Sequence, residues 1–129
     1  MKKTLEYIAY QGTCFTIEWC FNAKGQSQAL EYYESLTTDE RIKVLKLFKR
    51  MGDFGEIKDK TKFTNEGDKI YAFKPQPDRF LCFFYDGRKI ILTNAFRKKQ
   101  QKLPVLEKKR ALKLRAGYVD RTEAGEYYG

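Results

Sequence analysis

Apolar and polar residues alternate along residues 15–21, FTIEWCF, with the four apolar residues at odd positions on one side. A period of two is typical of a β-strand that buries one face. Residues 4–10, TLEYIAY, show a weaker form of the same pattern and predict a shorter strand. Two neighbouring strands are therefore expected in this part of the chain.

A helical period replaces the alternation in residues 27–36, SQALEYYESL, where apolar side chains recur three and four positions apart. Thr37 and Glu40 then form the capping-box pattern that begins a helix. This second helix is predicted to end at Gly52 and to bury a stripe of Ile42, Leu45, Phe48 and Met51. The two segments together predict a helical hairpin packed against a sheet.

The middle of the chain contains three further candidate strands. Residues 69–74, KIYAFK, predict the first, and the polar segment 53–68 before it is predicted to be a loop. Residues 79–85, RFLCFFY, are almost continuously apolar, which is typical of a central strand covered on both faces. Asp86-Gly87 is a strong hairpin signal and leads into the third strand, 89–96. These strands predict an antiparallel meander.

A last helix is predicted to begin at Pro104 and to end at Gly117. The expected fold class is α+β: an antiparallel meander sheet with an N-terminal helical hairpin and a C-terminal helix. Residues 1–117 are interpreted as a single domain, in which 1–14 add an N-terminal extension or an extra strand. The acidic tail 118–129 is expected to be mobile.

Charge is concentrated in one segment of the chain. The 129 residues carry 26 Lys and Arg against 17 Asp and Glu, a net charge of +9. Nine of these cations lie in residues 97–115, RKKQQKLPVLEKKRALKLR, where Glu107 is the one acid. A segment this basic indicates a polyanionic ligand, because each cation near a phosphate displaces a condensed counterion. The alternative is the solvated face of a helix.

The absence of histidine excludes several classes of enzyme. No Ser-His-Asp or Cys-His pair and no His-ligated metal site can form. Cys14, Cys20 and Cys82 are odd in number and lack CxxC spacing, so neither disulfides nor a Cys-metal cluster is predicted. We expect no metal, no cofactor and reduced thiols. No apolar stretch approaches the roughly 18 residues of a membrane span, and no signal peptide is evident, which predicts a cytoplasmic protein without a membrane partner.

Candidate chemistry gathers where the predicted strands end. Lys74 ends one strand and Arg79 begins the next, while the basic residues 97–99 follow the third strand. Such a cationic patch with nearby aromatic rings suits single-stranded RNA. The RNA-binding candidates are Lys60, Lys62, Tyr71, Arg97, Lys98 and Lys102.

The same patch permits RNA cleavage without histidine. The ribose 2′-hydroxyl attacks the adjacent phosphate, and Arg and Lys stabilise the additional negative charge. A lysine among other cations can also transfer protons. Charge and spacing alone favour binding at least as much as catalysis, and Arg79 alternatively pairs with Asp78 or Asp86.

Residues 15–121 resemble the RelE superfamily of bacterial and phage toxins, especially its HigB-like, phage-derived branch. The resemblance rests on the helix ALEYYESL, the loop with Lys60 and Lys62, the strand ending at Lys74, the segment DRFLCFFYDG with Arg79, and ILTNAFRKKQQKLP. It implies a small α+β fold and an mRNA endoribonuclease, often acting on the ribosome, that is neutralised by an antitoxin encoded beside it.

The resemblance also implies roles for single residues. Arg79 and Lys99 would stabilise the transition state, Lys74 would place the phosphate or transfer a proton, and Lys98 would bind the RNA backbone. Two positions depart from the family pattern. Ala72 stands where relatives often carry Glu. Val105 lies near the position in the final helix at which some relatives carry an aromatic acid.

Three hypotheses follow. The first is a toxin that cleaves mRNA, and the second is a non-catalytic protein that binds RNA, the ribosome or a protein partner through the same basic face. The third is a DNA-binding subunit, although no helix-turn-helix is evident. Operator DNA is therefore expected as a partner only for a toxin–antitoxin complex.

Overall fold

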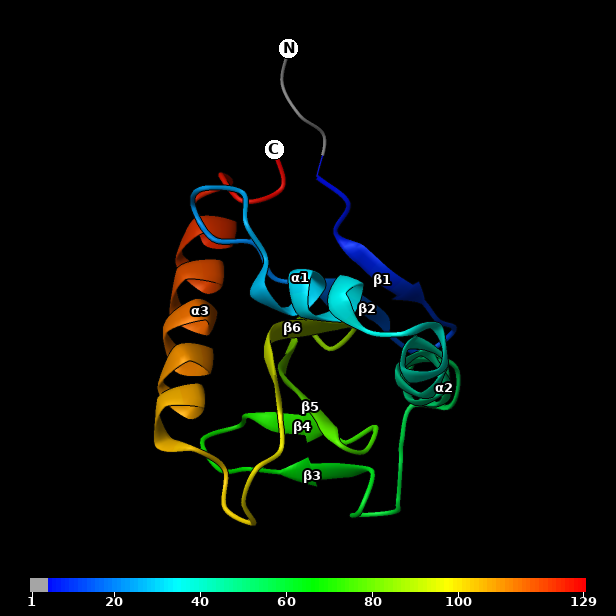
Figure 1. Ribbon diagram of the computed structural model, residues 1–129. Helices are drawn as coiled ribbons and strands as arrows, with labels where there is room; N and C mark the ends of the chain where they lie inside the picture. Colours follow the sequence, from blue (N-terminus) through cyan, green and yellow to red (C-terminus); the bar gives the residue numbers. More distant parts are fainter. Residues whose placement is uncertain (1–4) are drawn as a thin grey trace.

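The computed structural model describes residues 5–129 as a six-stranded sheet with three helices (Figure 1). The strands are β1 (Ile8–Gln11), β2 (Thr16–Trp19), β3 (Phe63–Asn65), β4 (Tyr71–Phe73), β5 (Asp78–Tyr85) and β6 (Lys89–Arg97), and the helices are α1 (Gln28–Ser35), α2 (Thr38–Phe54) and α3 (Val105–Glu123). The strand order is β1-β2-β6-β5-β4-β3, in which only β2 and β6 pair in parallel. The α+β fold class with a β4-β5-β6 meander is confirmed.

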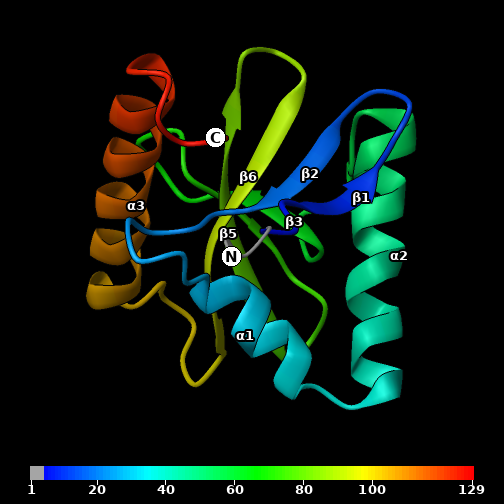
Figure 2. The same ribbon diagram turned by 90° about the horizontal axis from the view of Figure 1, so that it is seen from above.

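Helices cover both faces of the sheet. Figure 2 shows α2 and α3 on opposite sides, and α1 joins the core on the side of α2. Along β5, Phe80 and Cys82 belong to the core under α1 and α2, whereas Leu81 and Phe83 belong to the core under α3. A strand buried on both faces has no polar positions to alternate with. The interpretation of residues 79–85 as a central strand is therefore confirmed.

Local sequence signals set the starts and ends of several elements largely where they are predicted. The Ser27 hydroxyl caps α1 by accepting from the Leu30 backbone N–H, and Thr37 and Glu40 form a complete capping box at α2. Asp86 and Gly87 both have positive φ angles, 55° and 65°, in the β5–β6 turn. Two consecutive left-handed residues match the twist of a hairpin, which explains the Asp-Gly pair.

The buried stripe of α2 differs from the predicted one. Ile42 and Leu45 are 46% and 37% exposed, and the buried side chains are those of Val44, Leu47, Phe48 and Met51. Residues spaced by three, as in the predicted stripe, drift around the helix. Residues spaced alternately by three and four stay on one side, as the buried side chains do.

Gly52 does not end α2, which continues to Phe54 and is capped by Gly55 at φ 81°. Gly52 instead allows a close approach, because its backbone oxygen accepts from the N–H groups of Cys14 and Phe15 at 2.7 and 2.9 Å. A glycine inside the last turn therefore marks packing against the β1–β2 connection.

Two further boundaries and one predicted exposed face are corrected. The predicted loop 53–68 contains β3, whose three residues are too few to show a period. Among the described residues the first strand begins at Ile8, and the predicted start at residue 4 lies outside them. The second face of β2 is also covered, because Glu18 and Cys20 are 4% and 1% exposed.

Helix α3 passes Gly117 and continues to Glu123, and the residues beyond it pack on the sheet. Tyr118 is fully buried and Tyr127 is 5% exposed. The Tyr127 hydroxyl accepts from the Phe21 N–H at 3.0 Å, and the Tyr128 hydroxyl donates to Glu18 at 2.7 Å. These residues form a C-terminal clasp, and the continuation of α3 to Glu123 corrects the predicted helix end.

Candidate active site

A cationic cleft lies where β4 ends, β5 begins and β6 ends. These strands are antiparallel neighbours, so those three points meet at the same end of the sheet. The cleft encloses about 80 Å³. Its lining consists of Glu66, Ala72, Lys74, Arg79, Phe96, Lys98, Gln100, Gln101, Lys102, Leu103 and Pro104. Four predicted site residues, Lys74, Arg79, Lys98 and Lys102, are therefore brought together.

Strand alternation decides which predicted residues reach the cleft. Arg79 lies opposite Phe96 in the β5–β6 register, and both line the cleft on the α3 side. Tyr71 lies on the other face, where its ring stacks on Phe63 at a centroid distance of 5.6 Å and an angle of 4°. Arg97, next to Phe96, does not line the cleft either. The expected grouping of Tyr71 and Arg97 with Arg79 is thus corrected by the period of two.

Arg79 is the most buried cation of the cleft, with 8% of its surface exposed. Its Nη1 donates to the backbone oxygen of Asp78 at 2.8 Å and to Oε1 of Gln76 at 3.3 Å. Burial lowers the pKa of Arg79, while the charges of Glu66 and Asp78 oppose the shift. A guanidinium remains protonated at neutral pH, so the cleft holds an oriented, partly desolvated positive charge.

The lysines of the cleft come from separate segments. Lys74 donates its backbone N–H to the Lys62 oxygen at 2.8 Å and its Nζ to the Lys60 oxygen at 3.4 Å. The Lys98 N–H donates to the Pro77 oxygen at 2.9 Å, which ties the end of β6 to the start of β5. Lys102 follows in the connection to α3. Backbone hydrogen bonds therefore hold two of the three lysines in place.

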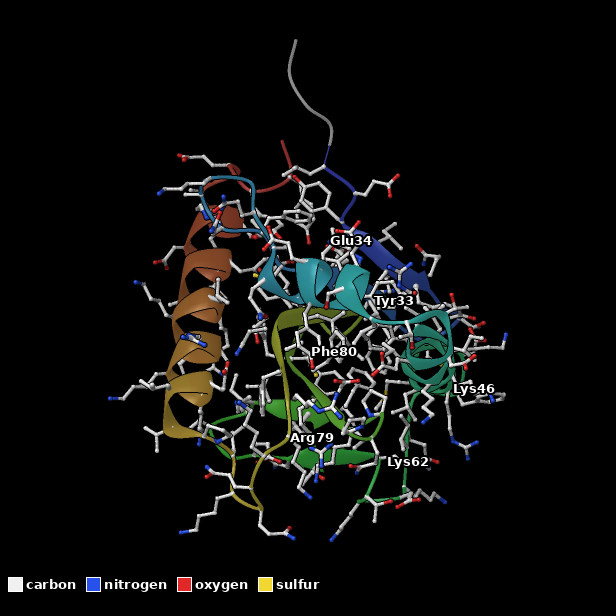
Figure 3. All side chains as sticks on the ribbon, in the orientation of Figure 1. Tyr33, Glu34, Lys46, Lys62, Arg79 and Phe80 are labelled. Carbon is white, nitrogen blue, oxygen red and sulfur yellow. The ribbon has the colours of Figure 1, made fainter. Side chains whose placement is uncertain are left out.

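Lys60, Lys62 and Lys99 do not line the cleft. Lys60 and Lys62 contribute backbone oxygens to Lys74, and the Lys62 side chain lines a groove shared with Lys46 of α2. Figure 3 shows Lys62 between Arg79 and Lys46, toward α2. Lys99 is exposed beside Lys98. The predicted RNA-binding roles of Lys60 and Lys62 would therefore be exercised outside the cleft. Lys99 is not brought together with Arg79 in the cleft, where its predicted role at the transition state would require it.

Sequence reasoning missed Glu66, Gln76 and Asn94. Glu66 lines the cleft from the β3–β4 connection, and Gln76 orients Arg79. Asn94 is 1% exposed and donates through Nδ2 to the backbone oxygen and Oε1 of Glu107, at 3.1 and 3.0 Å. It lies at a bulge in the β5–β6 register, where β6 gains one residue. The polar pair Thr93-Asn94 inside an apolar strand was the available signal for this bulge.

The geometry suits the stabilisation of a phosphate. The volume is about half of the roughly 150 Å³ that accommodates a benzene ring, so a phosphate group fits better than a base. Cations from β5 and from the connections after β4 and β6 surround that space. Across residues 5–129, no three Cys, Asp or Glu side chains are grouped to hold a metal ion.

Comparison with protein families adds to this geometry. A family model described as "Phage derived protein Gp49-like (DUF891)" matches residues 31–116, which is two thirds of the chain and includes every residue that lines the cleft. The chain belongs to the Gp49-like family. This family is of the RelE toxin type, and its members are commonly toxins of toxin–antitoxin systems, which implies an antitoxin partner. Comparison with curated proteins gives no match.

The Gp49-like chain contains no helix, within residues 5–129, that is both long and apolar enough to cross a membrane.

Proposed function

We propose that the chain is a toxin that inhibits translation as a metal-independent mRNA endoribonuclease of the HigB-like branch, acting on messages at the ribosome in the cytoplasm. One observation carries the proposal. Arg79, oriented by Gln76 and Asp78, is buried in a phosphate-sized cleft together with three lysines. In a RelE-type family, that arrangement favours chemistry at phosphate over simple attraction of RNA.

Each cation of the cleft has its own role in the proposed reaction. The 2′-oxygen of a ribose attacks the adjacent phosphorus, and negative charge grows on the oxygens of the five-coordinate intermediate. Arg79 donates to those oxygens, because both of its hydrogen bonds within residues 5–129 use Nη1 and leave Nε and Nη2 for the substrate. Lys74 and Lys98 hold the phosphate from the ends of β4 and β6, the two strands that flank β5. Lys99, Lys60 and Lys62, outside the cleft, bind the flanking RNA backbone.

The test compares two arginine variants. Purified wild type, Arg79→Ala and Arg88→Ala are incubated with free RNA in excess chelator and, in a separate Mg²⁺-containing buffer, with ribosomes carrying that message. Arg88 is an exposed control in the turn at the other end of β5 and β6, and its loss changes the net charge equally. Arg79→Ala is expected to cleave at least about 100-fold more slowly, as for loss of one donor to a transition-state oxyanion. Arg88→Ala should match the wild type.

A second readout comes from induced expression in bacteria. Wild type should arrest growth and create new mRNA 5′ ends in phase with codons, and Arg79→Ala should do neither while remaining folded. If wild type binds RNA yet leaves free and ribosome-bound messages intact, the catalytic proposal fails. The basic face is then a binding surface for RNA, the ribosome or a protein.

A further inference from the structure

Glu66 is the one acidic residue among those that line the cationic cleft. It lies in the β3–β4 connection, and its charge acts on Arg79. Within residues 5–129, its carboxylate makes neither an ion pair nor a hydrogen bond. An acid in this position is available to a ligand, because no neighbouring cation has captured it.

The backbone of Glu66 is held firmly. Its N–H donates to the Ile70 oxygen at 2.8 Å, and the turn between them places Gly67, Asp68 and Lys69 at φ angles of 89°, 54° and 61°. Positive φ is costly for the two non-glycine residues, so the turn requires support from its surroundings.

Helix α3 supplies that support through two cations. Lys108 Nζ donates to the Glu66 oxygen at 3.1 Å and pairs with the Asp68 carboxylate at 2.9 Å. Arg115 Nη1 donates to the Asp68 oxygen at 2.6 Å. Two members of the basic segment 97–115 thus fix the turn that presents Glu66 to the cleft.

We infer that Glu66 is the general base of the cleft, which accepts the proton of the attacking 2′-hydroxyl; this assignment rests on the proposed ribonuclease function. The 2′-oxygen–phosphorus bond forms while the bond from phosphorus to the 5′-oxygen breaks. The 2′ proton passes to the Glu66 carboxylate, and the departing 5′-oxygen takes a proton from the Lys74 ammonium. The products are a 2′,3′-cyclic phosphate and a 5′-hydroxyl end, and water later restores both side chains.

The surroundings of Glu66 suit this role. The charged groups around it are Lys74 after β4, Arg79 on β5, Lys98 and Lys102 after β6, Lys108 on α3, and Asp68 in its own turn. Ala72 of β4 also lines the cleft, but its methyl side chain cannot accept a proton. A carboxylate beside the guanidinium that holds the phosphate is close to the ribose that must be activated.

The test measures single-turnover cleavage of RNA by the full chain, with Glu66→Gln, Glu66→Ala and the exposed control Glu123→Gln. Removing a general base is expected to slow cleavage roughly 10²- to 10⁴-fold. RNA affinity should stay equal or rise, because a negative charge beside the phosphate is lost. The rise of rate with pH at the acidic side should vanish in Glu66→Gln, and added acetate should partly restore Glu66→Ala. Glu123→Gln should behave as wild type.

Each failure has its own signature. If wild type cleaves and Glu66→Gln remains within threefold of it, or keeps the same pH profile, Glu66 is not the base although the ribonuclease proposal stands. If Glu66→Gln loses RNA binding and rate together, Glu66 only positions the cleft. If wild type cleaves neither free nor ribosome-bound RNA, both proposals fall.

Discussion

Asp78 and Arg79 are neighbours in sequence on opposite faces of β5, and each is buried with a charge. Asp78 is 1% exposed, and its Oδ1 accepts from the Tyr32 hydroxyl of α1 at 2.5 Å. Arg79 faces the cleft on the other side. The hydrogen bond to Tyr32 therefore secures the strand start from which Arg79 projects, and a buried carboxylate without a donor is costly.

Replacing Tyr32 with Phe should lower the free energy of unfolding by about 1–3 kcal/mol, because the buried Asp78 carboxylate loses this donor. Urea unfolding at neutral pH measures the change. Tyr33→Phe is the matched control, since the Tyr33 hydroxyl makes no hydrogen bond to residues 5–129, and it should change stability by less than about 0.5 kcal/mol. Equal effects of the two substitutions would contradict this account.

At the scale of elements, the β1–β2 hairpin and α2 meet through glycine. A Cβ placed on Gly12 would lie 2.2 Å from the carbonyl carbon of Gly52, which is closer than real Cβ contacts come. A Cβ on Gly52 would meet the Tyr10 ring at 2.8 Å. The approach of the edge strand to the helix thus depends on two residues without side chains, and backbone cannot yield as a flexible side chain can.

Gly12→Ala should therefore destabilise the fold by roughly 1–3 kcal/mol, the usual cost of overpacking. Gly117→Ala is the opposite case, because a Cβ there meets nothing within 4 Å and the residue lies inside α3. That variant should stabilise the fold by about 0.5–1 kcal/mol. Thermal unfolding of both variants checks the signs, and a stabilising Gly12→Ala would show that the two backbones can separate freely.

The sequence predicts the elements whose signals are local. Capping at Thr37, the Asp86-Gly87 turn and the two-sided apolar run of β5 are each written within a few residues. The end of α2 is not, since Gly52 is used for packing and a glycine in a helical pattern is otherwise a stop signal.

The candidate site follows the same division. Lys74, Arg79 and Lys98 are predictable because antiparallel neighbours bring strand ends together. Tyr71 and Arg97 are misplaced because only the register fixes which face each residue occupies. Glu66 is missed because its position depends on contacts between the β3–β4 turn and a helix some 40 residues later in the chain. No local sequence pattern indicates such a contact between distant segments.

At the scale of the whole molecule, the C-terminal clasp joins α3 and the following residues to β2. Arg121 lies over the Tyr127 ring at 5.0 Å, and Tyr118 packs against Tyr127 at a centroid distance of 4.6 Å. Burial raises the pKa of Tyr118 to about 12 and that of Cys20 to about 12. The clasp therefore stabilises the sheet only while these groups keep their protons.

The free energy of unfolding should fall as the pH rises above about 9 and continue to fall to about 12. In the unfolded chain these groups lose their protons near their ordinary pKa values, about 8.5 for Cys and 10 for Tyr. The folded protein retains the protons to higher pH, so deprotonation favours unfolding. Urea titrations from about pH 8 to about pH 11 measure the slope. It should be shallower in Tyr118→Phe, and a flat wild-type profile would refute the assignment.

The parallel pairing of β2 with β6 joins two parts of the chain that are unequal in content. β1, β2, α1 and α2 precede 58–62, the exposed part of the connection after α2, whereas every residue that lines the cleft follows it. The two parts are joined across β2 and β6 and through the core under α2, not only through that connection. The chain is consequently suited to being split there. The second fragment would contain the cleft but expose an apolar sheet face, and binding of the first fragment would cover that face again.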